Sequence, residues 1–133
     1  MDKILTFTSR QAFREWLGEF GTESEGVWLL FGKKEKVKTL SAGEALEEAL
    51  CHGWIDGQIE SIDDNTYKKY FARRRPESKW SVKNKELAQT LIGKRLMTQQ
   101  GLEAIERARK NGSWDNAKRI IIDDGQIQMF KEI

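Results

Sequence analysis

The chain contains, at residues 54–74, the stretch WIDGQIESIDDNTYKKYFARR. Both halves are rich in residues that favour strands, and Asp64-Asn65 between them tolerate the positive φ angles of a tight turn. The stretch therefore predicts a β-hairpin with strands at 54–62 and 66–74. A two-residue turn would place acids opposite bases on one face and apolar or small residues together on the other. The expected pairs are Glu60 with Lys69, Asp56 with Arg73, Ile59 with Tyr70, and Gly57 with Ala72.

A third strand and a helix precede the hairpin. Residues 27–31 read VWLLF, and a run that is apolar at every position is typical of a strand covered on both faces. Before this strand, Thr8 and Gln11 have the spacing of a capping box. The apolar residues that follow recur with a helical period as far as Gly21, which we expect to take the left-handed position that ends a helix.

Further helices are marked by their capping residues. Ser41 and Glu44 repeat the capping-box spacing, and Gly53 ends the helix that they begin. The residues expected to cap one later helix each are Ser81, Thr98 and Ser113. The apolar residues at the end of the chain carry no helix stop signal, which indicates a truncated or divergent terminus. The fold class is therefore α+β: a short antiparallel sheet of about three strands including the hairpin, packed with several helices in a single domain over residues 1–133.

The composition indicates a cytoplasmic protein. The chain has 133 residues, enough for one hydrophobic core, and its longest apolar run is far shorter than the ~20 residues that span a bilayer. The N-terminus lacks the basic and apolar regions of a signal peptide. Cys51 is the only cysteine, so no internal disulfide can form, and this suits a reducing compartment.

Charge is segregated along the chain, although the net charge is only +2. Residues 41–66 hold seven acids and no Lys or Arg, whereas residues 67–85 hold eight bases and one acid. The aromatic residues interleaved with those bases are Tyr67, Tyr70, Phe71 and Trp80. Cations beside stacking rings are typical of single-strand or RNA binding, so a nucleic-acid-binding module that uses the 67–85 segment is one hypothesis.

Two other interpretations of the basic segment stay open. The acidic strand of the hairpin would neutralise these bases, with the rings in the core. Alternatively, the segment binds a small anion, because guanidinium groups match carboxylate and phosphate in shape and charge. The residues expected to bind such an anion are Arg73, Arg74, Arg75 and Lys79.

The sequence shows no catalytic or metal-binding pattern. Cys51 and His52 are neighbours on a helix and so point in different directions, and a helix C-terminus does not favour a thiolate. We therefore interpret Cys51 as a partly buried structural thiol and His52 as a polar helix-end residue that the helix dipole favours as a cation. One Cys and one His cannot complete a zinc shell, and no nucleotide-binding or hydrolase motif is present, so we expect no metal and no cofactor.

The segment ALCHGWIDG at residues 49–57 is the most specific of several that resemble a known family. The others are residues 7–17, Tyr67, residues 71–74, residues 79–81 and Asn84. Together they resemble the YdeI/OmpD-associated family, also called the bacteriocin-protection family, over roughly residues 7–112. The resemblance implies a stress or protection protein, and it transfers no catalytic residue. Members of that family usually continue into a basic, helical C-terminal segment that is missing here.

The family-like segments and the charge pattern indicate one candidate site. We expect a cleft where the second helix enters the hairpin, suited to a small anionic or aromatic ligand. Its expected residues are Trp54, Asp56, Tyr67, Arg73, Arg75, Trp80 and Ser81. The alternative is that the tryptophans only fix the corner between helix and hairpin while the arginines neutralise the acids.

The leading hypothesis is therefore a binding or stress-protection module rather than a proven enzyme, and its expected partner is a small anionic ligand or a protein. A nucleic-acid-binding module is the first alternative, and DNA or RNA binding that falls steeply with salt would identify it. An enzyme that acts on a small anionic substrate, with Asp56 as the base, is the second. Loss of a measured turnover in Asp56→Asn, with the fold intact, would identify that one.

Overall fold

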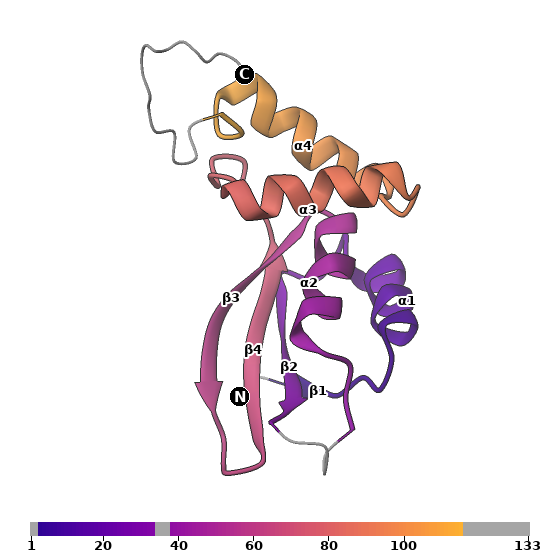
Figure 1. The fold of residues 1–133 in the computed structure, drawn as a ribbon, viewed down its shortest axis with the longest axis vertical. Coiled ribbons are helices and arrows are strands. Elements are labelled where there is room, and N and C mark those ends of the chain that lie inside the picture. The colour runs from indigo at the N-terminus through magenta and orange to yellow at the C-terminus, as the bar shows by residue number, and fades with distance from the viewer. Residues whose placement is uncertain (1–2, 34–37, 116–133) are drawn as a thin grey trace.

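The hairpin predicted from residues 54–74 is present. Strand β3 (Trp54–Ser61) runs antiparallel to strand β4 (Thr66–Arg73). The other edge of β4 pairs antiparallel with β2 (Gly26–Gly32), and β2 pairs in parallel with the two-residue strand β1 (Ile4–Leu5). The computed structural model describes residues 3–33 and 38–115, and the strands in these residues form one sheet in the order β1-β2-β4-β3 (Figure 1).

The α+β class is confirmed, but the sheet in the described residues is mixed and has four strands. Strand β1 is too short to show an alternating pattern, so the sequence did not indicate its parallel pairing. The helices in the same residues are α1 (Arg10–Phe20), α2 (Ala42–Cys51), α3 (Val82–Gly93) and α4 (Gln99–Asn111). The longest of these has 13 residues, and none is long and apolar enough to cross a membrane.

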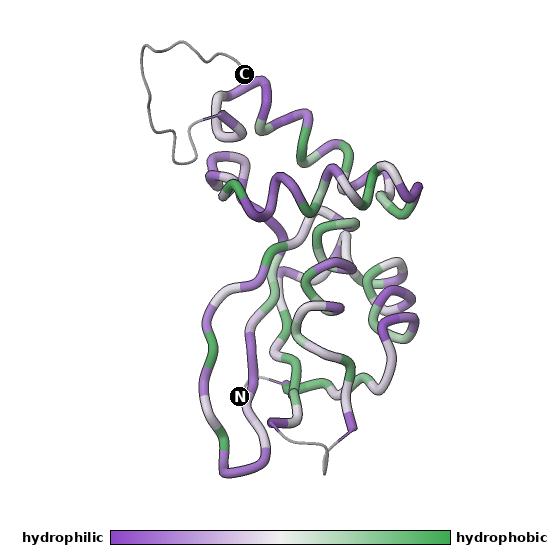
Figure 2. The backbone as a smooth tube through the Cα atoms, in the orientation of Figure 1, coloured by the Kyte–Doolittle hydropathy of each residue, from purple (hydrophilic) through white to green (hydrophobic). Residues whose placement is uncertain are grey.

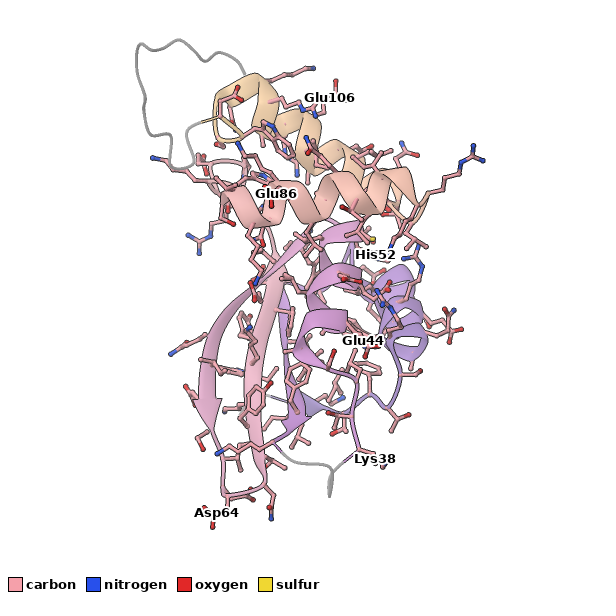
Figure 3. The ribbon with its side chains drawn as sticks, viewed as in Figure 1. Lys38, Glu44, His52, Asp64, Glu86 and Glu106 are labelled. Carbon is pink, nitrogen blue, oxygen red and sulfur yellow. The ribbon has the colours of Figure 1, made fainter. Side chains whose placement is uncertain are left out.

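The turn of the hairpin is organised by Asp63, not by the Asp64-Asn65 pair. The Asp63 carboxylate accepts hydrogen bonds from the backbone N–H groups of Asn65 and Thr66, both at 2.8 Å, and from the Thr66 hydroxyl at 2.9 Å. The connection is therefore longer than two residues, as is common where an Asp side chain caps its own turn. The hydrophilic tip of the hairpin lies far from α3 and α4 (Figures 2 and 3).

The longer turn shifts the pairing, so the predicted register was wrong. The observed partners are Ile59 with Lys69, Glu60 with Lys68, Asp56 with Phe71, and Trp54 with Arg73, and the register changes between Asp56 and Ile59. The acidic strand still neutralises part of the basic one. Asp56 forms an ion pair with Lys69 at 2.9 Å, and Glu60 lies 3.6 Å from Lys68.

Capping residues begin the helices largely as the sequence indicates. The predicted caps Ser41, Ser81 and Thr98 are confirmed, and Ser41 forms the full capping box with Glu44. Helix α1 is capped by Ser9, whose hydroxyl accepts a hydrogen bond from the N–H of Ala12 at 3.2 Å. The prediction of Thr8 was therefore wrong by one residue.

The end of α1 differs from the prediction. Gly21 is not left-handed, because its φ is −65°. A Cβ there would lie 2.4 Å from the carbonyl oxygen of Leu17, so close packing explains the glycine.

The helix predicted after Ser113 and the apolar residues at the C-terminal end lie outside the described residues.

Two hydrophobic clusters hold the elements together. In the first, Phe13 and Leu17 of α1 pack with Leu29 and Phe71 of the sheet, and all four are at most 1% exposed. In the second, residues of α3 and α4 pack with Trp80 and with Leu50 and Cys51 at the end of α2. Helices α3 and α4 lie at the end of the sheet where α2 also ends (Figure 1). The strand ends and the helix ends therefore meet between the two clusters, and the candidate site lies at this junction.

Strand β2 is covered on both faces, as predicted. Leu29 belongs to the cluster beneath α1 and α2. On the other face Trp28 is 7% exposed, because the ring of Tyr70 lies 5.2 Å from it between centroids and the ammonium of Lys68 lies over it at 4.3 Å. These two covering side chains come from the neighbouring strand β4.

Candidate functional site

A surface cleft of about 540 Å³ lies at the C-terminal end of β4, beside the C-terminal end of α2 and one side of α4. We call it the arginine cleft. Its charged lining residues are Arg73, Arg74, Arg75, Arg107, Glu25 and Glu103. The first three arginines follow one another at the end of β4, whereas Arg107 projects from α4. The remaining walls come from the loop between α1 and β2 and from the α2–β3 corner, which contributes His52 and Gly53.

The charge of the arginine cleft is unbalanced. Four guanidinium groups face two carboxylates, which leaves an excess of two positive charges. Within residues 3–33 and 38–115, none of these arginines lies within ion-pair distance of a carboxylate. Arg73 instead donates a hydrogen bond to the carbonyl of Thr22 at 3.3 Å. The cleft is therefore an electropositive recess suited to an anion.

Arg74 is the most unusual residue in the cleft, because its side chain is only 7% exposed. The guanidinium lies over the ring of Trp80 at 3.8 Å, and Nη2 donates to the Ser78 hydroxyl at 3.1 Å and to the Lys79 carbonyl at 3.2 Å. The other two nitrogens, Nε and Nη1, are buried and have no hydrogen-bond partner in the described residues. Buried donors are almost always paired, so these two mark a place where a partner is missing.

Burial also changes the acid–base properties of Arg74. Desolvation lowers its pKa from 12.5 to about 10, and the nearby carboxylate of Asp56 opposes that shift. At neutral pH the group still carries its full positive charge. A buried cation with two unpaired N–H donors is suited to donate to an oxyanion, since charge-assisted bonds are stronger than neutral ones.

The backbone of the α2–β3 corner depends on Gly53. Its φ of +80° is a left-handed angle that other residues rarely adopt, and a Cβ would lie 3.0 Å from the carbonyl oxygen of Gln100 in α4. The Gly53 carbonyl accepts a hydrogen bond from the N–H of Arg74 at 3.0 Å. Next to it, Trp54 donates from Nε1 to the Gly21 carbonyl at 3.2 Å. These two bonds fix the end of β4 and the α1–β2 loop, the walls of the cleft, to one corner.

His52 lies in the wall of the cleft, at the end of α2 nearest to α3 and α4 (Figure 3). Its Nδ1 is 3.0 Å from the backbone oxygen of Glu48, and the ring is 9% exposed. Burial lowers the pKa of His52 below its ordinary value of 6.5, and the charge of Arg14 adds to this. The expected cation was therefore wrong, because desolvation outweighs the helix dipole here.

Cys51 is fully buried, and burial raises the pKa of its thiol. This agrees with the interpretation of a structural cysteine. Its carbonyl oxygen accepts hydrogen bonds from the Thr98 backbone N–H at 2.9 Å and the Thr98 hydroxyl at 2.6 Å, so the residue fastens the start of α4 to the end of α2. No group of three or more His, Cys, Asp or Glu that could hold a metal ion exists in the described part of the chain.

The structure brings together only part of the predicted site. Arg73 and Arg75 line the cleft, whereas Trp80 does not line it but contacts the guanidinium of Arg74, which does. Trp54 is fully buried in the first cluster. Asp56 is occupied by its ion pair with Lys69.

The two remaining predicted residues lie elsewhere. Tyr67 stacks on Phe31 at 5.3 Å between ring centroids, and Ser81 caps α3. The sequence did not indicate Glu25, Glu103 or Arg107 for this site, because they come from elements whose placement depends on tertiary packing. The run of three arginines could be recognised in the sequence, but the residues of α4 that line the cleft with them could not.

Comparison with protein families adds one finding. A family described as a domain of unknown function, DUF8412, matches residues 5–104, which is most of the chain. This chain belongs to the DUF8412 family. The DUF8412 match includes each charged residue of the cleft except Arg107. No curated protein and no solved structure matches the chain.

Proposed function

We propose that this DUF8412 protein is a binding module whose arginine cleft holds a small anionic ligand. The observation that carries the proposal is Arg74, a buried guanidinium with two donor nitrogens that have no protein partner. A small shift of the side chains that cover these nitrogens would let a carboxylate or phosphate oxygen accept from them and neutralise part of the excess charge. The exposed side chains of Arg73, Arg75 and Arg107 would complete its coordination from two sides.

The location of the cleft supports the same proposal. It is built from the ends of α2, β4 and α4, so its residues are held by rigid elements and by the corner at Gly53. Convergent polar groups on rigid elements are typical of ligand sites. A purely structural role for the arginines would pair them with carboxylates, as Arg10 and Arg14 are paired with Glu48 at 2.8 Å.

The test is isothermal titration with inorganic phosphate and with succinate at low ionic strength. Arg107→Ala removes one exposed arginine of the cleft, and Arg109→Ala, two residues along α4, removes one outside it. We expect Arg107→Ala to weaken binding about tenfold, since a charge-assisted hydrogen bond contributes ~1.5–3 kcal/mol. Arg109→Ala should bind as the wild type does. Equal losses in both variants would show only unspecific attraction to positive charge and would refute the proposal.

The resemblance to the YdeI/OmpD-associated family supports a stress or bacteriocin-protection role for this binding. The most specific part of that resemblance, residues 49–57, supplies His52 and Gly53 to the cleft, and residues 71–74 supply two of its arginines. Production of the protein in a bacteriocin-sensitive bacterium should raise survival, and Arg107→Ala should reduce that gain. Full protection by the variant would separate the protective role from the cleft.

The other two hypotheses find less support. Lys68 and Lys69 are engaged by Glu60 and Asp56, and the ring of Trp80 is buried, so these two bases and this ring are not free to contact a nucleic acid. Asp56 does not line the arginine cleft, and a carboxylate held in an ion pair is a poor base for a substrate bound there.

A further inference from the structure

The hydrogen-bonding state of His52 is fixed by its neighbour. Its Nδ1 lies 3.0 Å from the backbone carbonyl oxygen of Glu48, one turn earlier in α2. A carbonyl oxygen can only accept, so the ring hydrogen is on Nδ1. The bond satisfies one of the carbonyl groups that every helix leaves free at its C-terminal end. The neutral ring therefore carries its lone pair on Nε2.

The surroundings of His52 keep the ring neutral. Desolvation and the cation of Arg14 in α1 both lower its pKa, and the opposing effects of Glu48 are weaker. The cleft side adds the guanidinium groups of the β4 end and of Arg107, which also disfavour a second cation, while Glu25 and Glu103 favour one. In the described residues Nε2 has no hydrogen-bond partner, and His52 is one of the residues that line the cleft.

The guanidinium groups of the cleft and the acceptor nitrogen of His52 make different hydrogen bonds to a ligand. Guanidinium groups only donate, so the arginines alone cannot distinguish two oxyanions of equal shape and charge. A fixed acceptor can make that distinction. It gains a hydrogen bond from an anion that carries an O–H group, and it meets lone pairs on an anion that carries none.

We propose that Nε2 of His52 accepts a hydrogen bond from the bound ligand, so that the arginine cleft selects oxyanions that carry an O–H group, as hydrogenphosphate does. This inference rests on the proposed anion-binding function. Sulfate is the discriminating probe, because it matches hydrogenphosphate in shape and charge but has no proton to donate. Phosphate should therefore bind about tenfold or more tightly than sulfate, the effect of one such hydrogen bond.

The first test measures phosphate and sulfate affinities for the wild type and for His52→Asn. The asparagine amide can keep the bond to the Glu48 carbonyl while removing the acceptor at the Nε2 position. The variant should lose the preference for phosphate and keep its affinity for sulfate. Because Glu103 is also an acceptor in the cleft, the control is Glu103→Met, which removes its acceptor oxygens and should keep the preference.

The second test needs no variant. His52 is the only histidine in the chain, so its ring nitrogen resonances identify themselves in a protein without a histidine tag. Long-range proton–nitrogen spectra should show hydrogen on Nδ1 at neutral pH, and phosphate but not sulfate should shift the Nε2 resonance. A hydrogen on Nε2, or a charged ring, would overturn the inference.

The outcomes separate the two proposals. If both anions bind with equal affinity and His52→Asn changes nothing, the role of His52 is refuted and anion binding stands. The same holds if Glu103→Met, and not His52→Asn, removes the preference. If neither anion binds the wild type, both proposals fail.

Discussion

Replacing Arg74 by methionine tests whether its charge serves the fold or a ligand. The lowered pKa, from 12.5 to about 10, means that burial makes the cation less stable by about 3 kcal/mol. The bonds from Nη2 to Ser78 and Lys79 contribute ~1.5–3 kcal/mol each, as hydrogen bonds of a charged donor. Methionine would keep an apolar contact with Trp80, and sulfur packs well against rings.

The two bonds together exceed the cost of burying the cation by zero to about 3 kcal/mol. We expect Arg74→Met to change the free energy of unfolding by less than about 3 kcal/mol, measured by urea unfolding followed through tryptophan fluorescence. The matched control is Arg109→Met, which removes an exposed guanidinium that lies 5.0 Å from the ring of Trp114, outside the cleft. It should change stability by less than about 1 kcal/mol.

The two variants should differ in their response to ligand. A ligand at about 100 times its dissociation constant adds ~2.7 kcal/mol to the stability of the wild type. Phosphate at that concentration should stabilise Arg109→Met equally and leave Arg74→Met unchanged. The reasoning is refuted if Arg74→Met unfolds the domain, because the charge would then belong to the fold. It is also refuted if that variant keeps the full stabilisation by phosphate.

Three further predictions concern the elements that hold the cleft. Gly53→Ala should destabilise the protein by ~1–3 kcal/mol in thermal unfolding because of its φ of +80°, whereas Gly93→Ala, with nothing within 4 Å of the new Cβ, should stabilise it by up to ~1 kcal/mol. The free energy of unfolding should fall as the pH drops below 6.5, because His52 has a lower pKa in the folded protein and the unfolded chain therefore binds its proton first. Urea unfolding at several pH values should show a smaller fall for His52→Asn. Glu48→Gln should destabilise by ~3–5 kcal/mol, since it removes a carboxylate that is 3% exposed and bonded to two arginines, and Glu47→Gln, half-exposed with one partner, by less than ~1 kcal/mol. Equal effects of the two glutamine variants in urea unfolding would contradict this ranking.

The hairpin could be predicted because turn residues and β-forming residues are local signals. Its register could not, because that depended on which of two adjacent aspartates caps the turn. Asp63 accepts three hydrogen bonds and lengthens the connection, and an irregularity beside Asp56 shifts the ladder again. Both effects are decided by a few bonds that residue type alone does not specify.

The charge pattern was informative, but its partners were assigned incorrectly. Part of the acidic block pairs with α1, since Glu48 binds Arg10 and Arg14 rather than the basic segment. In the hairpin, the shifted register pairs Asp56 with Lys69 instead of the expected Arg73. The unpaired arginines of the cleft therefore depend on strand register and helix packing, which no local pattern in the sequence indicates.

The neutral state of His52 follows from the same kind of competition. The helix dipole favours a cation at this position, but it contributes only ~0.3–1 kcal/mol on an exposed surface. Burial of the ring and the charge of the nearby Arg14 act in the opposite direction and prevail. Sequence position therefore indicated the wrong charge, because exposure is a tertiary property.

The most direct test of the account observes the Nε–H group of Arg74 by proton–nitrogen NMR while phosphate is added. The signal is identified by its absence in Arg74→Met. The account predicts a saturable shift of this signal, together with backbone shifts around residues 52–53, 73–76 and 103–107. A signal that does not move, or shifts confined to Lys68 and Lys69 on the hairpin, would contradict the claim that the arginine cleft binds an anion.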